Sequence, residues 1–140
     1  MATFVGVDNG TQITVDVTNL PPGMHGIHIH EFGSCNALRD TAGAVTPFGS
    51  AGNHFDPAAT KMHKGPDGGG HAGDLPMLHV DVNGNGRLAF FNSAVMTSGP
   101  NTIVGRSIVI HANPDNYTDT PPGGGSGGRI ACGEIGAPTS

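Results

Sequence analysis

Two turns rich in Asn and Gly constrain this chain most, because each separates runs in which apolar and polar residues alternate. The first turn, residues 8–10 (Asp-Asn-Gly), precedes residues 12–17, where every second residue is apolar. The second, residues 83–86 (Asn-Gly-Asn-Gly), separates residues 78–82 from residues 87–91. Asn-Gly is typical of tight hairpin turns, and alternation with a period of two is typical of strands with one buried face. The sequence therefore predicts antiparallel hairpins.

The composition is typical of a β-rich chain with long turns. Of the 140 residues, 24 are Gly and 11 are Pro, and they separate short runs rich in Val, Ile and Thr. Further strands are predicted at residues 27–29, 102–111 and 129–132, whereas no segment of useful length shows helical periodicity. We therefore expect one all-β domain over residues 1–140.

Two long stretches interrupt this pattern. Residues 31–77 and 112–128 have no sustained period of either kind. The first is far longer than an ordinary loop in a compact domain. Something other than a hydrophobic core must order it, and a bound cation can do so.

The predicted strands carry histidines on the face opposite their core residues. His28 and His30 are one residue apart, so their side chains leave the strand on one face, while Ile27 and Ile29 point into the core. His111 ends another predicted strand on its non-core face. These three imidazoles are candidate metal ligands, and an all-nitrogen set suits copper(II).

The first irregular stretch holds a second candidate set: His54, His63, His71 and Asp74. Nitrogen and oxygen ligands of this kind indicate a closed, tetrahedral structural zinc site. Two sites are most easily completed if one imidazole serves both, and His54 lies between the strand pair and the rest of the zinc set. Because two adjacent dications allow an imidazole to lose both ring protons, we predict that His54 bridges the two metals.

The cysteine count leaves two interpretations open. Cys35 and Cys132 are the only cysteines, and the count alone fits a disulfide as well as two buried thiols. A disulfide would close a loop of roughly 100 residues, worth about 4 to 5 kcal/mol in the chain-entropy model. It would favour an extracellular or periplasmic location.

Five motifs, in this order, closely resemble the copper,zinc superoxide dismutase family. They are His25-Gly-Ile-His-Ile-His30-Glu-Phe-Gly, Ala51-Gly-Asn-His54-Phe-Asp-Pro57, His71-Ala-Gly-Asp-Leu-Pro76, Gly105-Arg-Ser-Ile-Val-Ile-His111 and Gly128-Arg-Ile-Ala-Cys-Gly133. The resemblance covers about residues 10–136. The loop after His111 is similar to that of bacterial members. Members usually carry a further strand ahead of the first hairpin, which we expect this chain to lack.

The resemblance implies both a fold and a reaction. The fold is a Greek-key β-barrel or immunoglobulin-like sandwich of seven or eight strands, with long loops ordered by metals. The reaction is the antioxidant dismutation of superoxide to O2 and hydrogen peroxide, in which copper cycles between Cu(II) and Cu(I) and zinc is structural. The implied copper ligands are His28, His30, His54 and His111, and the implied zinc ligands are His54, His63, His71 and Asp74.

Two further pairings follow from the same resemblance. Asp115 would hydrogen-bond one copper histidine and one zinc histidine, His28 and His63, and so tie the sites together. Cys35 and Cys132 match the family's disulfide. That disulfide would pin the first part of the long loop to the closing strand.

The predicted catalytic residues are Arg129 and His54. We expect Arg129 to clamp the anionic substrate beside copper, because a fixed guanidinium fork suits a small oxyanion. His54 would carry a proton to the product. Lys61 and Lys64 fit either a positive rim or a solvated loop. Gly123 stands where some members have a Thr that narrows the copper channel.

Net charge and hydropathy restrict the classes of possible partner. A net charge of −5 argues against nucleic acid or an anionic membrane as a partner, and no apolar run is long enough to span a bilayer. Superoxide is the expected substrate, and both a homodimer and a monomer fit the sequence. The disulfide favours a periplasmic or extracellular location, whereas the lack of a signal peptide at the start of the chain leaves the cytoplasm open.

Other classes of metal-binding protein share parts of this pattern. A copper carrier or zinc scaffold of the same fold stays open, although the chain keeps every copper histidine and Arg129. Zinc hydrolases with a His-x-His-x-Asp motif need an Asp where this chain has Phe32, and cupins need a Glu at a spacing absent here. A blue-copper protein needs a cysteine ligand near a histidine pair, but Cys35 matches the disulfide.

Overall fold

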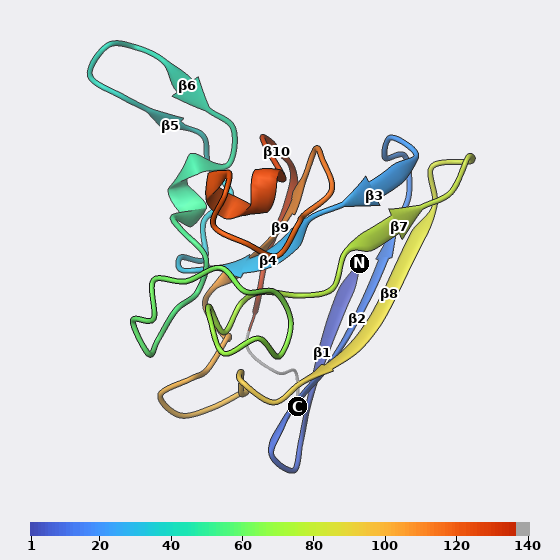
Figure 1. The fold of residues 1–140 in the computed structure, drawn as a ribbon, viewed down its shortest axis with the longest axis vertical. Coiled ribbons are helices and arrows are strands. Elements are labelled where there is room, and N and C mark those ends of the chain that lie inside the picture. The colour runs from blue at the N-terminus through green and yellow to red at the C-terminus, as the bar shows by residue number, and fades with distance from the viewer. Residues whose placement is uncertain (137–140) are drawn as a thin grey trace.

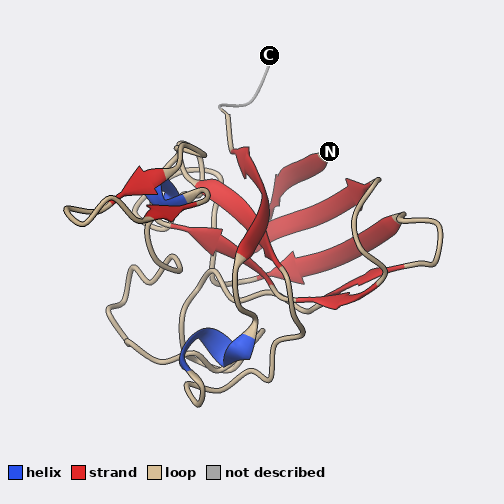
Figure 2. Ribbon diagram, turned by 90° about the horizontal axis from the view of Figure 1, so that it is seen from above, coloured by secondary structure: helices blue, strands red, loops and turns tan. Residues whose placement is uncertain are grey.

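The computed structural model describes residues 1–136, which form two antiparallel sheets packed face to face (Figures 1 and 2). The five-stranded sheet has the order β1-β2-β8-β7-β3, and the three-stranded sheet has the order β10-β9-β4. The strands are β1 Ala2–Val7, β2 Gly10–Val17, β3 Gly23–His25, β4 Ile27–His30, β5 Leu38–Arg39, β6 Val45–Thr46, β7 Leu78–Val80, β8 Gly86–Asn92, β9 Ser107–His111 and β10 Arg129–Glu134. The prediction of an all-β sandwich is confirmed, with the ribbon β5-β6 standing apart from the two sheets.

Short 3-10 turns are the only helices among residues 1–136: η1 Gly49–Ala51 and η2 Pro122–Gly125. None is long or apolar enough to cross a membrane.

The predicted hairpins form around the expected turns. β1 pairs with β2 so that Val7 lies opposite Gly10, and Asn9 in the turn has φ 70°, a left-handed conformation that Asn tolerates. β2 then pairs with β8. Ile13 of β2 and Ile27 of β4 come from the two different sheets and belong to the same buried hydrophobic cluster. The alternation in the sequence thus correctly identifies the core face.

Two predicted strands are shorter than expected because turns begin earlier. β7 ends at Val80, since the carboxylate of Asp81 accepts hydrogen bonds from the backbone of Asn83 and Asn85, both at 2.9 Å. β9 begins only at Ser107 because Gly105 takes φ 83° and closes a turn first. β3 was not predicted.

The outer face of the three-stranded sheet is covered by the long loops. All residues of β4 and β9 are buried, although their histidines point away from the sandwich core. Gly26 separates β3 from β4 and is packed against the loop after β9. A Cβ on Gly26 would lie 2.6 Å from the Cβ of Ser126 and 3.3 Å from that of Asp115. The missing side chain therefore lets this loop approach the histidine strand.

Candidate metal centre

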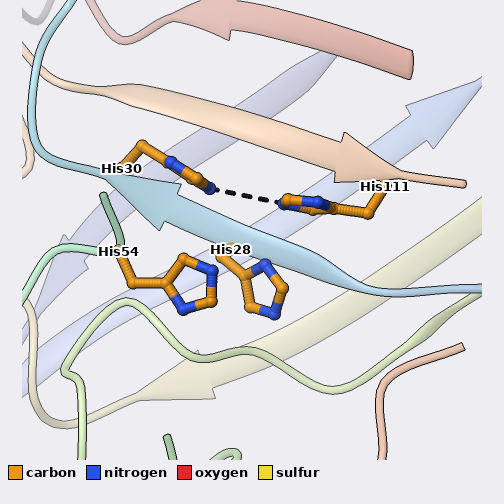
Figure 3. Close-up of side chains that lie close together, drawn as sticks. All are labelled: His28, His30, His54 and His111. Atoms are coloured by element: carbon orange, nitrogen blue, oxygen red, sulfur yellow. Dashed lines mark hydrogen bonds between the residues drawn. The ribbon is translucent and has the colours of Figure 1, made fainter. Parts of the chain in front are cut away.

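Four imidazoles converge on the covered face of β4 and β9 (Figure 3). His28 and His30 come from β4, His111 ends β9, and His54 follows η1 in the long loop. Each residue offers a ring nitrogen within 4.8 Å of those of the others. His54 reaches the cluster because it forms an antiparallel bridge with His30. These are the four residues predicted to bind copper.

Three of these rings each use one ring nitrogen for a hydrogen bond to a group outside the cluster. His30 Nδ1 donates to the carbonyl of Gly52 at 2.9 Å, and His111 Nδ1 donates to the carbonyl of Gly127 at 3.0 Å. His28 Nε2 donates to Asp115 Oδ2 at 2.6 Å. In each case the second nitrogen is left as a lone-pair donor, and the Nε2 atoms of His30 and His111 face each other at 3.4 Å.

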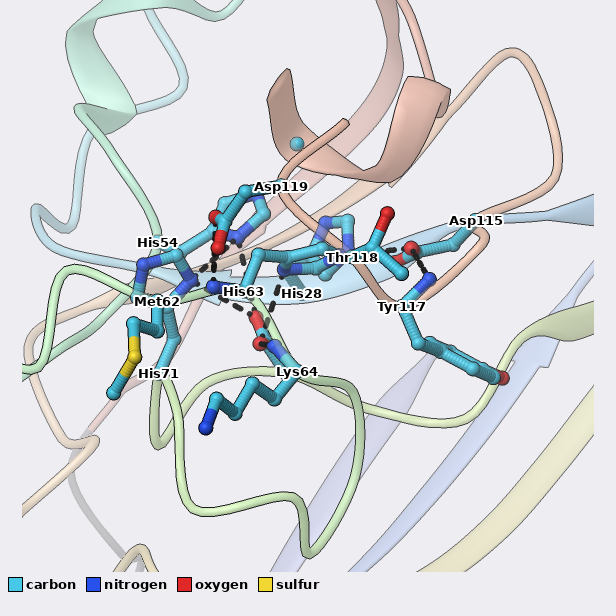
Figure 4. A network of polar contacts seen from close by, with 12 residues as sticks. His28, His54, Met62, His63, Lys64, His71, Asp115, Tyr117, Thr118 and Asp119 are labelled. Carbon is cyan, nitrogen blue, oxygen red and sulfur yellow. Dashed lines mark hydrogen bonds and ion pairs between the residues drawn. The ribbon is translucent and has the colours of Figure 1, made fainter. Parts of the chain in front are cut away.

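A second cluster surrounds the carboxylate of Asp74. Its imidazoles, His54, His63 and His71, are labelled in Figure 4. His63 Nδ1 lies 3.0 Å from Oδ2, while the Nδ1 atoms of His54 and His71 lie 3.2 and 3.4 Å from Oδ1. The Nδ1 atoms of His54 and His71 are 3.3 Å apart. The four residues predicted to bind zinc therefore meet at one place.

Two imidazoles lie close to both clusters. His28 and His54 each offer a nitrogen within 4.8 Å of those of His30 and His111, and likewise of the donors of His63 and Asp74, a group that does not include His71. The rings of His28 and His54 stack at 3.9 Å. Nε2 of His28 is hydrogen-bonded to Asp115. Nδ1 of His54 faces Asp74, and among residues 1–136 no hydrogen bond occupies its Nε2. A ligand shared by two metals needs both nitrogens, which favours His54.

Asp115 connects the two clusters. Its Oδ2 accepts the bond from His28, and its Oδ1 accepts one from His63 Nε2 at 2.8 Å (Figure 4). Gly124 lies directly over this carboxylate. A Cβ on Gly124 would be 2.0 Å from Oδ1 and 2.9 Å from His63 Nε2, so the loop can close only with glycine there.

Two buried ring nitrogens have no hydrogen-bond partner among the described residues, and their positions indicate whether the clusters fit metal ions. Nδ1 of His28 and Nδ1 of His63 are buried and have no hydrogen-bond partner; the contact of His63 with Asp74 lacks the alignment of a hydrogen bond. Buried polar atoms are nearly always satisfied. Both belong to rings whose Nε2 is fixed by Asp115, so their lone pairs are directed into the clusters, where a cation would satisfy them.

Burial keeps the copper-type imidazoles neutral. Loss of solvent lowers the pKa of His28 to about 3, of His30 to about 2 and of His111 to about 4, and overcomes the hydrogen bonds that oppose it. Burial lowers the pKa of His54 as well. Metals bind the neutral form of imidazole, so these nitrogens are available at neutral pH.

The zinc-type cluster is charged when it holds no cation. Burial opposes the charge on His63, but the hydrogen bond to Asp115 and the close carboxylate of Asp74 outweigh it and raise its pKa to about 9. Burial would raise the pKa of Asp74 and Asp115, yet bonds from the surrounding histidines hold both well below the usual range. Asp74 and Asp115 therefore stay negatively charged, and their two charges would balance the charge of a bound dication.

Arg129 lies next to the copper-type cluster. Its guanidinium donates to the carbonyl of Phe48 at 2.9 Å and to that of Gly52 at 2.6 Å. Gly52 also holds His30, and the charge of Arg129 helps to lower the pKa of both His30 and His111. The guanidinium is therefore fixed within electrostatic range of these rings.

A cavity of about 570 Å³ opens onto the clusters from the solvent. The only site side chains that line it are His54 and His71, whose side chains are 11% and 17% exposed. Its charged lining residues are Lys61, Glu31, Asp56 and Asp119. Three carboxylates and one lysine line this cavity, so its wall has no excess of positive charge. Gly123 also lines the cavity, and a Cβ there would meet no atom within 4 Å.

One positioning contact was not predicted. The backbone N–H of His63 donates to Asp119 Oδ1 at 2.9 Å, so the loop after β9 holds a zinc-type histidine through its main chain (Figure 4). Asp119 lies 56 residues away in the sequence, and no pattern indicates the contact.

The two cysteines form a disulfide. Cys35 and Cys132 are bonded, with their Cα atoms 5.7 Å apart. The bond ties the start of the long loop to β10, on which Arg129 lies. The disulfide prediction is confirmed.

Comparison with known proteins finds one family over most of the chain. The family model of copper/zinc superoxide dismutase matches residues 1–135. A superoxide dismutase [Cu-Zn] of Deinococcus radiodurans is 48% identical over 135 residues, which are 94% of this chain and 74% of the relative. One from Escherichia coli K12 is 42% identical, covering 95% of this chain and 76% of the relative.

Solved structures show the same fold. The Cu/Zn superoxide dismutase from Brucella abortus superposes with a TM-score of 0.86 at 37% identity, over 96% of this chain and 86% of that one. The clock protein EA4 superposes with a TM-score of 0.81 at 35% identity, over 96% and 84% of the two chains.

The fold and the paired donor clusters define a two-metal β-sandwich protein. The chain belongs to the copper/zinc superoxide dismutase family.

Proposed function

We propose that this chain dismutates superoxide, with copper and zinc held in neighbouring sites. Copper would be held by His28, His30, His54 and His111, and zinc by His54, His63, His71 and Asp74. The observation that supports this most is the position of His54 between the two clusters, with Nδ1 on Asp74 and its ring stacked on His28.

The chemistry follows from the donor types. Copper, when bound, supplies the one-electron oxidation and reduction that the reaction requires. Two superoxide anions and two protons give O2 and hydrogen peroxide. His54 holds one of these protons at the nitrogen that faces the copper cluster, and water supplies the other.

The remaining residues orient the site. Asp115 fixes the rings of His28 and His63, and the carbonyl of Gly52 fixes His30. Arg129 attracts and orients the anion, because its fork is held by two carbonyls and its charge has no carboxylate partner among the described residues.

A periplasmic or extracellular location is proposed from the disulfide, which persists in oxidising compartments. The net charge of −5 supports the view that neither nucleic acid nor an anionic membrane is a partner.

Metal analysis and a direct superoxide assay test the function together. The purified chain is loaded with copper and zinc, with zinc alone, or with neither, and superoxide decay is followed by stopped flow. We expect one copper and one zinc per chain and rapid decay only in the doubly loaded protein. Full loading without decay would instead indicate a copper carrier or a zinc scaffold.

A further inference from the structure

Arg106 is a half-buried cation outside the two metal clusters. Its Nε donates to the carbonyl of Thr102 at 2.8 Å, and its Nη1 donates to the carbonyl of Glu31 at 2.9 Å. Its guanidinium lies over the ring of Phe55, 4.0 Å from the centroid. Within residues 1–136 no carboxylate lies at ion-pair distance from it. A partly desolvated charge without a counter-ion is costly, so these contacts require an explanation.

The two distant contacts of Arg106 fall at equivalent places in the chain. Glu31 directly follows His30, and Phe55 directly follows His54. His30 and His54 face each other in a short antiparallel pairing, flanked by the bonds from Glu31 N to Asn53 O at 2.9 Å and from Phe55 N to Ile29 O at 2.8 Å. Arg106 therefore touches both strands of this pairing, one through a carbonyl and the other through a buried ring.

We propose that Arg106 is a positioning residue for the copper site, which sets the separation of His30 and His54 by clamping the residue after each. The inference rests on the proposed function, because it takes both histidines as copper ligands. The planar guanidinium can contact two carbonyls with its edge while its face covers the ring of Phe55, which the point charge of a lysine cannot do. His30 is proposed as a ligand of copper alone, whereas His54 is shared with zinc, so the clamp acts on two copper ligands and on one zinc ligand. The effect should therefore fall on copper more than on zinc.

The test compares R106M, R106K and the control R87M in the full chain. Arg87 is exposed and only 3.8 Å from Asp16 in a weak ion pair, so its loss changes the charge equally without touching the site. The readouts are copper and zinc affinities from chelator competition, the Cu(II) electron paramagnetic resonance spectrum, and thermal unfolding of the metal-free protein.

We expect R106M to weaken copper binding by about tenfold or more and to shift the Cu(II) spectrum, with a clearly smaller change for zinc. R106K should lie between R106M and the parent, and R87M should match the parent. A lower unfolding temperature with unchanged copper affinity and spectrum in R106M would overturn the proposal, because Arg106 would then be merely structural. If His30→Ala leaves copper binding unchanged in the parent background, the copper-site assignment itself fails, which is a separate result.

Discussion

Replacing Asp115 by Asn tests the link between the two clusters. The carboxylate accepts from His28 Nε2 at 2.6 Å on Oδ2, and from His63 Nε2 at 2.8 Å and the backbone N–H of Tyr117 at 2.7 Å on Oδ1. An asparagine of the same shape has one acceptor oxygen and one NH2 group. One of the two buried imidazole N–H groups must then face a donor.

The size of the effect follows from this mismatch. Leaving one buried donor unsatisfied costs about 1 to 3 kcal/mol, and disrupting an outer hydrogen bond of a ligating histidine typically weakens metal binding about 10- to 100-fold. The affected ring also loses the contact that fixes its tautomer. Because Asp115 holds one ring of each cluster, we expect weaker binding of at least one metal by this factor and a measurable loss for the other.

Chelator competition titrations with copper and zinc measure both affinities in D115N and in the parent. The matched control is D8N, which removes the same charge from an exposed turn. D8N should leave both affinities unchanged. If D115N also binds both metals as tightly as the parent, within about twofold, Asp115 does not orient the ligands and the linkage argument is refuted.

Three further predictions concern the anion, the shared ligand and pH. R129A should lower the rate constant with superoxide by about tenfold or more at low ionic strength and by less at high ionic strength, with both metals still bound; unchanged turnover at low salt would remove the clamp. H54A should alter the spectra of copper and of cobalt in the zinc site together, whereas a change at only one metal would mean that His54 does not bridge. In the metal-free protein, the lowered pKa values of the copper histidines, about 3, 2 and 4 against 6.5 when unfolded, contribute stability above pH 6.5 that is lost as the pH falls. The pKa of His63, raised to about 9, contributes stability below pH 6.5 that is lost as the pH rises toward 9. Thermal unfolding should therefore show greatest stability near pH 6.5, and a flat profile from about pH 5 to 9 would be inconsistent with these shifts.

The sequence predicts well what depends on local periodicity. The one-residue spacing of His28 and His30 places both side chains on one face of β4, and the alternation in β2 identifies Ile13 and Val15 as core residues. Two strand ends were misplaced because side-chain and glycine turns, at Asp81 and Gly105, override the run of apolar residues.

Local sequence patterns did not predict the contacts between distant loops. The pairing of Asp115 with His28 and His63 came only from the family resemblance, since it joins residues 87 and 52 positions apart. The bond from His63 to Asp119 had no sequence indication, and neither did the position of Arg106 over Phe55. Such contacts depend on how the loops fold over the sheet, which the period of a strand does not encode.

Anomalous diffraction can locate each metal relative to His54. Crystals of the copper- and zinc-loaded protein are measured on both sides of the copper and zinc absorption edges. We expect one copper peak among His28, His30 and His111, one zinc peak beside Asp74, and the His54 ring between them. Two peaks that do not flank this ring, or a single mixed peak, would contradict this expectation.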